Sequence, residues 1–244
     1  HTLSLHDALP IFDKNLRGET MANVTYETRD EIAVLTMDDG KANAINCEMI
    51  EEINALLDRA EGESKAVLIV GREGIFCGGF DLRVIRSKNI ERKRKQFLEG
   101  TRLAMRLYGF PKPVVAAVSG SSVALGAFLL LTADYRIGVN GSFRIGVNEV
   151  AIGMSLPPFA LMLAESRISA QFLTNAIISA TLYSPKEAIA VGFLDEVTKK
   201  RDLLSRSIKK AQSLAQLDVD SFSRVKLDIR GAQIRKVLET LPNM

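Results

Sequence analysis

The chain has 244 residues, of which 47% are hydrophobic and 25% charged, ordinary values for a globular protein. Its 32 basic and 29 acidic side chains leave a net charge of +3, too balanced to predict nucleic-acid binding, and no apolar run is long enough to cross a membrane. Cys47 and Cys77 form neither a disulfide framework nor a zinc motif. We therefore expect a reducing compartment, the cytoplasm or the matrix of an organelle.

The first twenty residues differ in character from the rest of the chain. They lack the basic start and long apolar stretch of a secretory signal, and the regular hydrophobic pattern begins only after Met21. We interpret residues 1–20 as a non-native or disordered leader, either a translated cloning scar or a short native extension. Both histidines, His1 and His6, lie in it. If the leader is foreign, a general acid or base must be a carboxylate, lysine, tyrosine or cysteine.

From Met21 onward the sequence alternates between strand and helix patterns. Residues 24–28 and 32–37 predict two strands joined by a hairpin turn at residues 29–31. Further short apolar runs predict buried strands, which lie at residues 66–70, 114–118, 134–139 and 195–198. Strands that alternate with helices indicate an α/β core with a parallel sheet.

Three helices can be placed from their end signals and periodicity. Asn46 can cap a helix over residues 47–60, and residues 126–132 are apolar all round, as in a buried helix. Ser184 begins a third helix with proline at its first position and glutamate at its third, and Gly192 ends it. Beyond this point the pattern is helical and more polar. We therefore expect a core domain over residues 21–198 and a helical lobe over residues 199–244.

Two glycine-bearing segments follow predicted strands and lead toward helices. In residues 74–82, Gly78 and Gly79 let the backbone approach a ligand, and the N–H groups at a helix start can bind an oxyanion. In residues 119–126 a second helix start would supply a second donor. Two such donors could stabilise an enolate, although an ordinary strand-to-helix turn explains either segment alone.

Glu149 is a lone carboxylate between apolar residues, with Ile145 before it and Ile152 after it. A carboxylate that is desolvated in such a setting has a raised pKa, as a general base requires. The alternative is a glutamate that faces solvent from a loop. The neighbouring serines Ser121 and Ser122 are poor candidates for a nucleophile, because no histidine of the body can activate them.

Together these segments, in this order and spacing, resemble the crotonase (enoyl-CoA hydratase/isomerase) superfamily over residues 23–198. Residues 41–45 resemble its Asn-Ala-Leu segment, residues 76–82 its Phe-Cys-Ala-Gly-Ala-Asp-Leu stretch, and residues 118–134 its Val-Asn-Gly to Cys-Asp block. The resemblance implies an α/β spiral of β-β-α units with a C-terminal helical lobe. It also implies an acyl-coenzyme A thioester as substrate, no metal or covalently bound cofactor, and a homotrimer or hexamer.

The same resemblance assigns roles to individual residues. It implies that the backbone N–H groups of Phe80 and Leu125 form an oxyanion hole and that Glu149 is the acid–base residue. It further implies contacts with coenzyme A, made by Lys41, Ala42, Ala44, Gly78, Asp81, Leu82 and Gly126.

One departure from the family pattern bears on the reaction. Typical hydratases carry two glutamates that share a water, and Phe128 stands where the first of them would lie, whereas Glu149 matches the second. Single-glutamate Δ3,Δ2-enoyl-CoA isomerases resemble the chain at residues 134–137, 145–149 and 157–159. The resemblance therefore favours isomerisation of an enoyl-CoA. The alternatives are hydration or another crotonase reaction, and a weakly catalytic protein that binds RNA or coenzyme A.

A basic run in the middle of the chain has three possible roles. It could contact the phosphates of coenzyme A, bind RNA, or form only a solvated helix face. Few aromatic residues interleave with it, so stacking on single-stranded nucleic acid is not indicated and nucleic acid is not the expected partner. Its members are Arg83, Arg86, Lys88, Arg92, Lys93, Arg94 and Lys95.

Overall fold

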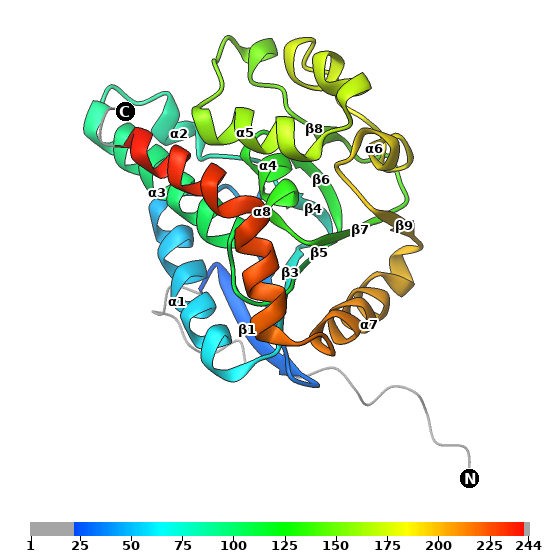
Figure 1. The fold of residues 1–244 in the computed structure, drawn as a ribbon. Coiled ribbons are helices and arrows are strands. Elements are labelled where there is room, and N and C mark those ends of the chain that lie inside the picture. Colours follow the sequence, from blue (N-terminus) through cyan, green and yellow to red (C-terminus); the bar gives the residue numbers. More distant parts are fainter. Residues whose placement is uncertain (1–21, 242–244) are drawn as a thin grey trace, which may run out of the picture.

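The computed structural model describes residues 22–241, so the leader expected at residues 1–20 lies outside the described residues. The centre of the fold is a six-stranded sheet (Figure 1). Its strands, in spatial order, are β1 (Val24–Arg29), β2 (Ile32–Met37), β3 (Ala66–Gly71), β5 (Val114–Val118), β7 (Tyr135–Val139) and β9 (Glu196–Thr198). Only β1 and β2 pair antiparallel, and every other neighbouring pair in this sheet is parallel, as the alternation of strands and helices predicted.

The β1–β2 hairpin has the predicted turn. Asp30 and Glu31 both adopt a positive φ, 48° and 64°, as the two central residues of a type I′ turn require. Successive side chains of β2 then alternate between the two faces of the sheet: Leu35 belongs to the larger hydrophobic core and Val34 to a second core on the opposite face. Because β2 is covered on both faces, it reads as a continuous apolar run.

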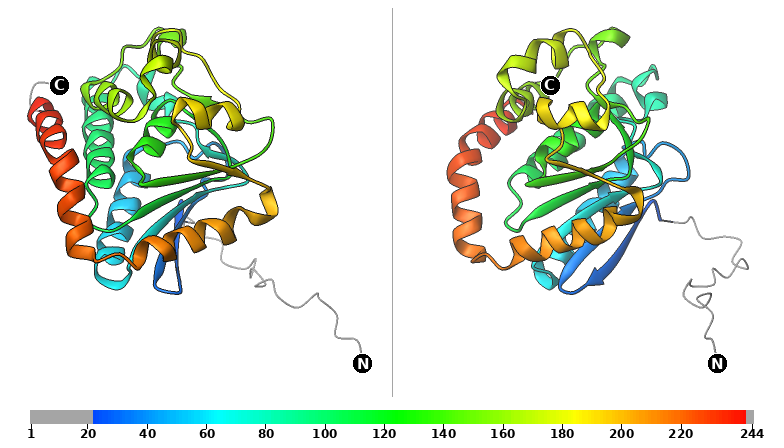
Figure 2. Two further views of the ribbon diagram at one scale, coloured as in Figure 1. Left: turned by 45° about the vertical axis from the view of Figure 1, so that its right-hand side comes forward. Right: turned by 90° about the vertical axis from the view of Figure 1, so that its right-hand side faces the viewer.

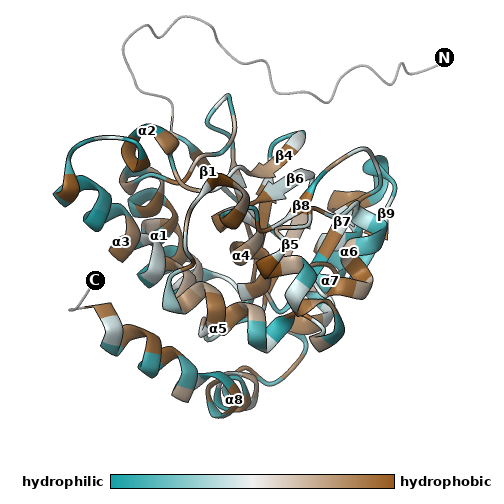
Figure 3. Cartoon of the chain, turned by 90° about the horizontal axis from the view of Figure 1, so that it is seen from above, coloured by the Kyte–Doolittle hydropathy of each residue, from teal (hydrophilic) through white to brown (hydrophobic). Residues whose placement is uncertain are grey.

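Helices cover both faces of this sheet. The second core lies under α7 (Leu203–Ala215), which contributes Leu203 and Ala211 to it (Figure 2). The larger core lies beneath three helices, α1 (Cys47–Glu63), α3 (Ile90–Tyr108) and α4 (Leu125–Thr132). The predicted cap of α1 is present, since the side chain of Asn46 accepts from the N–H of Met49. All residues of α4 are buried, and Figure 3 shows this helix as hydrophobic ribbon enclosed by the other elements.

A second, three-stranded sheet was not predicted from the sequence. It consists of β4 (Gly74–Cys77), β6 (Gly120–Val123) and β8 (Ile145–Gly146), all parallel. Residues 74–82 and 119–126 are therefore more than turns between a strand and a helix, because each segment contains a short strand of its own. These strands are short and rich in glycine and serine, so they carry neither the apolar run nor the alternation that identifies a strand.

The C-terminal part is helical, as predicted. The helix α6 (Pro185–Val191) begins with a complete capping box of Ser184 and Glu187, and Gly192 ends it with φ 105°. The last helix, α8 (Val219–Thr240), packs against α3 and α5 (Pro158–Arg167). The division into a core and a separate lobe at residue 199 stays a prediction. The remaining short helices are α2 (Leu82–Ile85), η1 (Val150–Ile152), η2 (Ala170–Phe172), η3 (Thr174–Ile178) and η4 (Lys200–Asp202).

Candidate active site

The small sheet brings the three candidate segments together. Phe80 comes shortly after β4, Leu125 shortly after β6, and Glu149 shortly after β8. Because the three strands are parallel and β6 lies between the other two, their carboxyl ends meet at one edge. Segments that are far apart in the sequence therefore leave adjacent strands at the same edge of this sheet.

Phe80 and Ile45 form an isolated parallel β-bridge, and neither hydrogen bond of this bridge uses the N–H group of Phe80. The N–H of Ile45 donates to the carbonyl of Gly79 at 2.8 Å, and the N–H of Asp81 donates to the carbonyl of Ile45 at 3.0 Å. Phe80 lies between these two hydrogen bonds, so its own N–H faces away from Ile45. We expected this N–H at a helix start; instead α2 begins later, at Leu82 with Asp81 as its cap, and the bridge orients the donor.

Leu125 is the first residue of α4, and its N–H has no partner within the helix. The preceding residue, Ala124, has no side-chain oxygen that could cap this helix, which leaves the N–H of Leu125 open to a ligand. Ala124 adopts φ 54° and ψ −130°, a backbone conformation that costs on the order of 1–3 kcal/mol for a residue other than glycine. Its N–H donates to the carbonyl of Gly146, which ties the start of α4 to β8.

The two segments predicted to form the oxyanion hole lie in close contact. A Cβ placed on Gly79 would lie 2.8 Å from the Cβ of Ala124 and 3.4 Å from the nitrogen of Leu125. A Cβ placed on Gly126 would lie 2.2 Å from the carbonyl oxygen of Cys77. Only glycine permits both approaches. The structure therefore places Gly126 as the contact between α4 and β4; its predicted contact with coenzyme A stays a prediction.

The side chains of Phe80 and Leu125 point toward α3. A Cβ added to Gly100 would lie 2.5 Å from the ring of Phe80 and 3.8 Å from Cδ2 of Leu125. Both side chains are thus packed away from their own N–H groups. A leucine at the second predicted oxyanion position is therefore compatible with a ligand at its backbone, because the side chain lies in the core beside α3.

Glu149 is a buried carboxylate with an unsatisfied oxygen. Only 8% of the residue is exposed, and Oε2 has no hydrogen-bond partner among residues 22–241. Burial raises the pKa of Glu149, although the backbone N–H groups of Asn148 and Glu149 itself oppose the shift. A carboxylate in this state can accept a proton near neutral pH more readily than one in water.

Other groups near the site are less suitable as a base. The carboxylate of Asp81 is engaged by the backbone and side chain of Arg83, and the side-chain hydrogen bond from Arg83 lowers its pKa. Burial raises the pKa of the Cys77 thiol to about 12, so it stays protonated. Phe128 is buried in α4 against Phe159 and carries no acid–base group. Among the described residues, Glu149 is the only buried glutamate.

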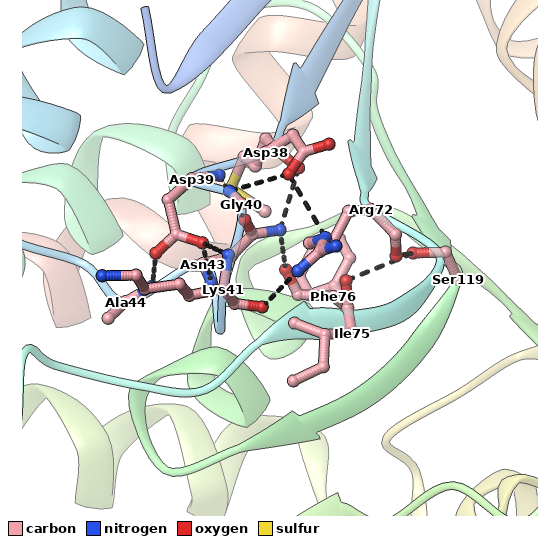
Figure 4. A network of polar contacts seen from close by, with 11 residues as sticks. Asp38, Asp39, Gly40, Lys41, Asn43, Ala44, Arg72, Ile75, Phe76 and Ser119 are labelled. Atoms are coloured by element: carbon pink, nitrogen blue, oxygen red, sulfur yellow. Dashed lines mark hydrogen bonds and ion pairs between the residues drawn. The ribbon is translucent and has the colours of Figure 1, made fainter. Parts of the chain in front are cut away.

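The predicted coenzyme-binding loop is held rigidly beside the oxyanion segment (Figure 4). The fully buried side chain of Asn43 donates to the carbonyl oxygens of Met37 and Phe76, at 2.8 and 3.1 Å. Asp39 accepts from the backbone of this loop, through the N–H groups of Lys41, Asn43 and Ala44. Sequence reasoning did not identify these two anchoring roles, because they depend on contacts between distant segments.

The predicted coenzyme contacts fall into two groups. The N–H of Gly78 donates to the carbonyl of Ala42 at 2.8 Å, which places residues 41–44 beside the segment that carries Phe80. Leu82 is exposed next to the cap residue Asp81, whose carboxylate is already occupied by Arg83. Contact of any of these residues with coenzyme A stays a prediction.

The basic run is divided between two elements. Arg83 and Arg86 lie on or directly after α2, and the members from Arg92 to Lys95 lie in the first turns of α3. Most are exposed, and Arg83 pairs with Asp81. The run is a solvated surface in this chain, and its contact with phosphate groups stays a prediction.

Among residues 22–241, no group of three or more His, Cys, Asp and Glu side chains is arranged to hold a metal ion. None of the helices in this part of the chain combines the length and the apolar character needed to span a membrane.

Comparison with known proteins finds clear relatives. Residues 27–240 match the family model described as enoyl-CoA hydratase/isomerase. The chain is 29% identical over 188 residues to the mitochondrial enoyl-CoA delta isomerase 1 of Rattus norvegicus, covering 75% of this chain and 65% of the rat protein. The chain thus spans less than two thirds of that relative.

A bacterial relative and a solved structure extend the comparison. The chain is 30% identical over 212 residues to a probable enoyl-CoA hydratase of Rhodobacter capsulatus, covering 83% of this chain and 79% of that protein. The crystal structure of an enoyl-CoA hydratase/isomerase family protein from Pseudomonas syringae is 36% identical with a TM-score of 0.88. That match covers 91% of this chain and 96% of the other.

Proposed function

The chain belongs to the enoyl-CoA hydratase/isomerase family, and we propose that it moves the double bond of a 3-enoyl-CoA to position 2. As a member of this family it is an enzyme of the crotonase superfamily, which acts on acyl-coenzyme A thioesters. Its relatives are named both isomerase and hydratase. The choice of isomerisation rests on the arrangement of the chain's own residues.

In the proposed reaction Glu149 removes a proton from C2 of the bound thioester. The electrons of the broken C–H bond form a C1–C2 double bond, and the carbonyl oxygen takes the negative charge of a dienolate. The N–H groups of Phe80 and Leu125 donate to that oxygen, where the charge develops. The protonated Glu149 then gives its proton to C4, the double bond settles between C2 and C3, and the carbonyl re-forms.

The observation that carries the proposal is a single buried carboxylate without an acid–base partner. Glu149 has an unsatisfied oxygen, and the ring of Phe128, which stands where the resemblance to the family implies a second glutamate, is buried. A base that returns the same proton to another carbon of the same substrate needs no second carboxylate. Concerted addition of water would need a second acid–base group, which would help to hold the water and would donate a proton to the substrate. Phenylalanine can do neither.

The test compares two substrates, each supplied separately to the purified protein. With 3-hexenoyl-CoA we expect the absorbance of a conjugated 2-enoyl thioester to grow, and with crotonyl-CoA we expect little hydration. Glu149→Gln should lower kcat by about 10²- to 10⁴-fold and leave binding of coenzyme A intact. The matched control is Glu165→Gln, which removes an exposed glutamate of α5. Hydration of crotonyl-CoA at a comparable rate without isomerisation would refute the single-base mechanism.

Hydration is the second candidate, because the Rhodobacter capsulatus relative is named a probable enoyl-CoA hydratase. In that case a water held by Glu149 alone would attack C3. The crotonyl-CoA assay decides between the two reactions. We further propose that the protein works as a homotrimer or hexamer in the cytoplasm or an organelle matrix, which sedimentation and localisation of the tagged protein would test.

A further inference from the structure

The side chain of Arg72 joins the turn between β3 and β4 to the predicted coenzyme-binding loop, residues 38–44 (Figure 4). Its Nη1 donates to the carbonyl oxygen of Lys41 at 2.7 Å, and its Nε lies 3.2 Å from Oδ1 of Asp38. The side chain is half-buried, and the proposed reaction gives it no role. Its contacts nevertheless fix part of the loop.

The backbone of Arg72 is anchored to the small sheet. Its carbonyl oxygen accepts from Oγ of Ser119 at 2.6 Å and from the N–H of Ile75 at 3.2 Å. Ile75 belongs to β4, and Ser119 directly precedes β6. Arg72 therefore connects the loop to the two strands that lead to the proposed oxyanion donors.

The hydrogen bond to Lys41 sets the direction of one peptide group. A peptide is planar and trans, so the N–H of Ala42 points opposite to the carbonyl of Lys41. A carbonyl that is held toward Arg72 therefore directs the N–H of Ala42 away from Arg72. The next peptide is held as well, because the carbonyl of Ala42 accepts from the N–H of Gly78.

The N–H of Ala42 is the one backbone donor of this stretch that has no acceptor among residues 22–241. Each of the other N–H groups in residues 39–45 donates to a side chain of the loop itself or, for Ile45, to the carbonyl of Gly79. Ala42 is only half-buried. Its N–H is therefore the backbone donor that the loop leaves for a ligand.

Arg72 also offsets the negative charge of the loop. Asp38 and Asp39 are neighbours in it, whereas the phosphate groups of coenzyme A make the predicted ligand an anion. Burial opposes the ionisation of Asp39, but backbone N–H groups of the loop and the charge of Arg72 together hold its pKa below the usual value. Asp39 is thus ionised at neutral pH, and without Arg72 it would repel an anionic ligand more strongly.

We propose that Arg72 is a positioning residue for coenzyme A, which directs the N–H of Ala42 toward an acceptor atom of the bound coenzyme. It acts through the carbonyl of Lys41 and does not touch the reacting atoms. The inference rests on the proposed contact of this loop with coenzyme A. It does not depend on whether the acyl group is isomerised or hydrated.

The first measurement is calorimetric titration of the full chain with coenzyme A itself, so that no reaction contributes. Arg72→Met removes the donor and the charge but keeps a long side chain. Its Kd should rise about tenfold, as expected when the equivalent of one charge-assisted hydrogen bond is lost. Arg72→Lys retains a charged donor and should recover most of the lost affinity.

Steady-state kinetics with 3-hexenoyl-CoA separate binding from chemistry. In Arg72→Met we expect KM to rise about tenfold and kcat to stay within about twofold, because Glu149 and both proposed oxyanion donors are unchanged. If crotonyl-CoA is the substrate instead, the same division between KM and kcat is expected with it.

The matched control is Arg106→Met. Arg106 also donates to a backbone carbonyl, that of Asn54, and also pairs with an aspartate, Asp58, but it joins α3 to α1 outside the loop. The variant should leave the Kd for coenzyme A within about twofold of the unaltered chain. Urea denaturation of each variant shows how far its stability has changed.

Amide hydrogen exchange tests the direction of the N–H group itself. Coenzyme A should slow the exchange of the Ala42 N–H in the unaltered chain, and much less so in Arg72→Met. Protection in the unaltered chain is measured without any variant, so misfolding of Arg72→Met cannot hide the answer.

Three outcomes would overturn the proposal. These are an Ala42 N–H that coenzyme A does not protect, a Kd of Arg72→Met within twofold of the unaltered chain, and an equal loss of affinity in Arg106→Met. The last would mean that the arginine acts only through stability. A chain that hydrates crotonyl-CoA without isomerising 3-hexenoyl-CoA, and that still shows the protection and the change in Kd, would refute the isomerisation and support the role of Arg72.

Discussion

The ring of Phe80 rests against the backbone of α3 at Gly100, where an added Cβ would lie 2.5 Å from two ring carbons. The ring also contacts Phe97 of the same helix, with the ring centroids 5.0 Å apart and an interplanar angle of 66°. A glycine inside a helix lowers helix stability by roughly 1 kcal/mol relative to alanine. Here it makes room for the residue whose N–H we propose as an oxyanion donor.

Gly100→Ala should therefore impair the proposed reaction without touching a group that contacts substrate. The added methyl displaces the ring of Phe80 and with it the N–H donor, and a misplacement on the order of 1 Å lowers kcat by about 10- to 100-fold. Because the dienolate is formed only during the reaction, KM should change less than kcat. Steady-state kinetics with 3-hexenoyl-CoA measure both.

The matched control is Gly62→Ala in α1, where an added Cβ meets no atom within 4 Å. It should raise the free energy of unfolding by about 0.5–1 kcal/mol and leave kcat unchanged. Full activity of Gly100→Ala would show that the position of Phe80 does not matter to the reaction.

The reaction rate should fall on the acidic side through the pKa of Glu149. Burial raises this pKa above the usual value for glutamate, and only the ionised form removes a proton from C2. The profile of kcat/KM against pH should therefore have its acidic limb above the range of an exposed carboxylate. A rate independent of pH down to pH 4.5 would contradict the assignment.

The same burial predicts that Glu149→Gln stabilises the fold at neutral pH. A raised pKa in the folded state means that the folded chain holds the proton where the unfolded chain has lost it. The free energy of unfolding therefore falls as the pH rises from the pKa of Glu149 in the unfolded chain to its higher pKa in the folded chain. Above that pH range ionised Glu149 destabilises the fold. The variant should unfold with a free energy higher by on the order of 1 kcal/mol at pH 7. Urea denaturation, with Glu165→Gln as control, measures the difference.

Phe128→Leu should lower stability without altering the pH profile. The ring packs edge-on against Phe159, with centroids 6.0 Å apart, and its loss leaves part of a buried volume empty. We expect a loss of about 1–2 kcal/mol in the free energy of unfolding. Phe159→Leu, which removes the other ring of the pair, should cost a similar amount. A changed acidic limb in Phe128→Leu alone would mean that this position takes part in proton transfer.

Asn43→Ala should detach the loop that we propose holds the coenzyme. The variant leaves the carbonyl oxygens of Met37 and Phe76 without their donor and removes a residue type that tolerates φ 49°. The free energy of unfolding should fall by about 2–4 kcal/mol. KM for the thioester should rise more than kcat falls. Asn89→Ala, which removes only the cap of α3, should cost about 1 kcal/mol.

Much of the fold could be read from local patterns. The six strands of the large sheet and the helices α1, α4 and α6 lie where apolar runs and caps predicted them, and the likeness to the Pseudomonas syringae structure confirms the expected crotonase fold. The small sheet could not be read in this way. A two-residue strand such as β8 has no periodicity, and it exists only because β6 lies beside it.

The sequence by itself determined the candidates: a carboxylate among apolar residues, two glycine-bearing segments, and a phenylalanine where a second glutamate would stand. Only the tertiary structure decided how these residues meet. It freed the N–H of Phe80 through a bridge to Ile45, directed the side chain of Leu125 toward α3, and buried Glu149 without a partner for Oε2. The physical reason is that hydrogen bonds between distant segments and desolvation depend on which atoms lie nearby in space, and local sequence does not encode those neighbours.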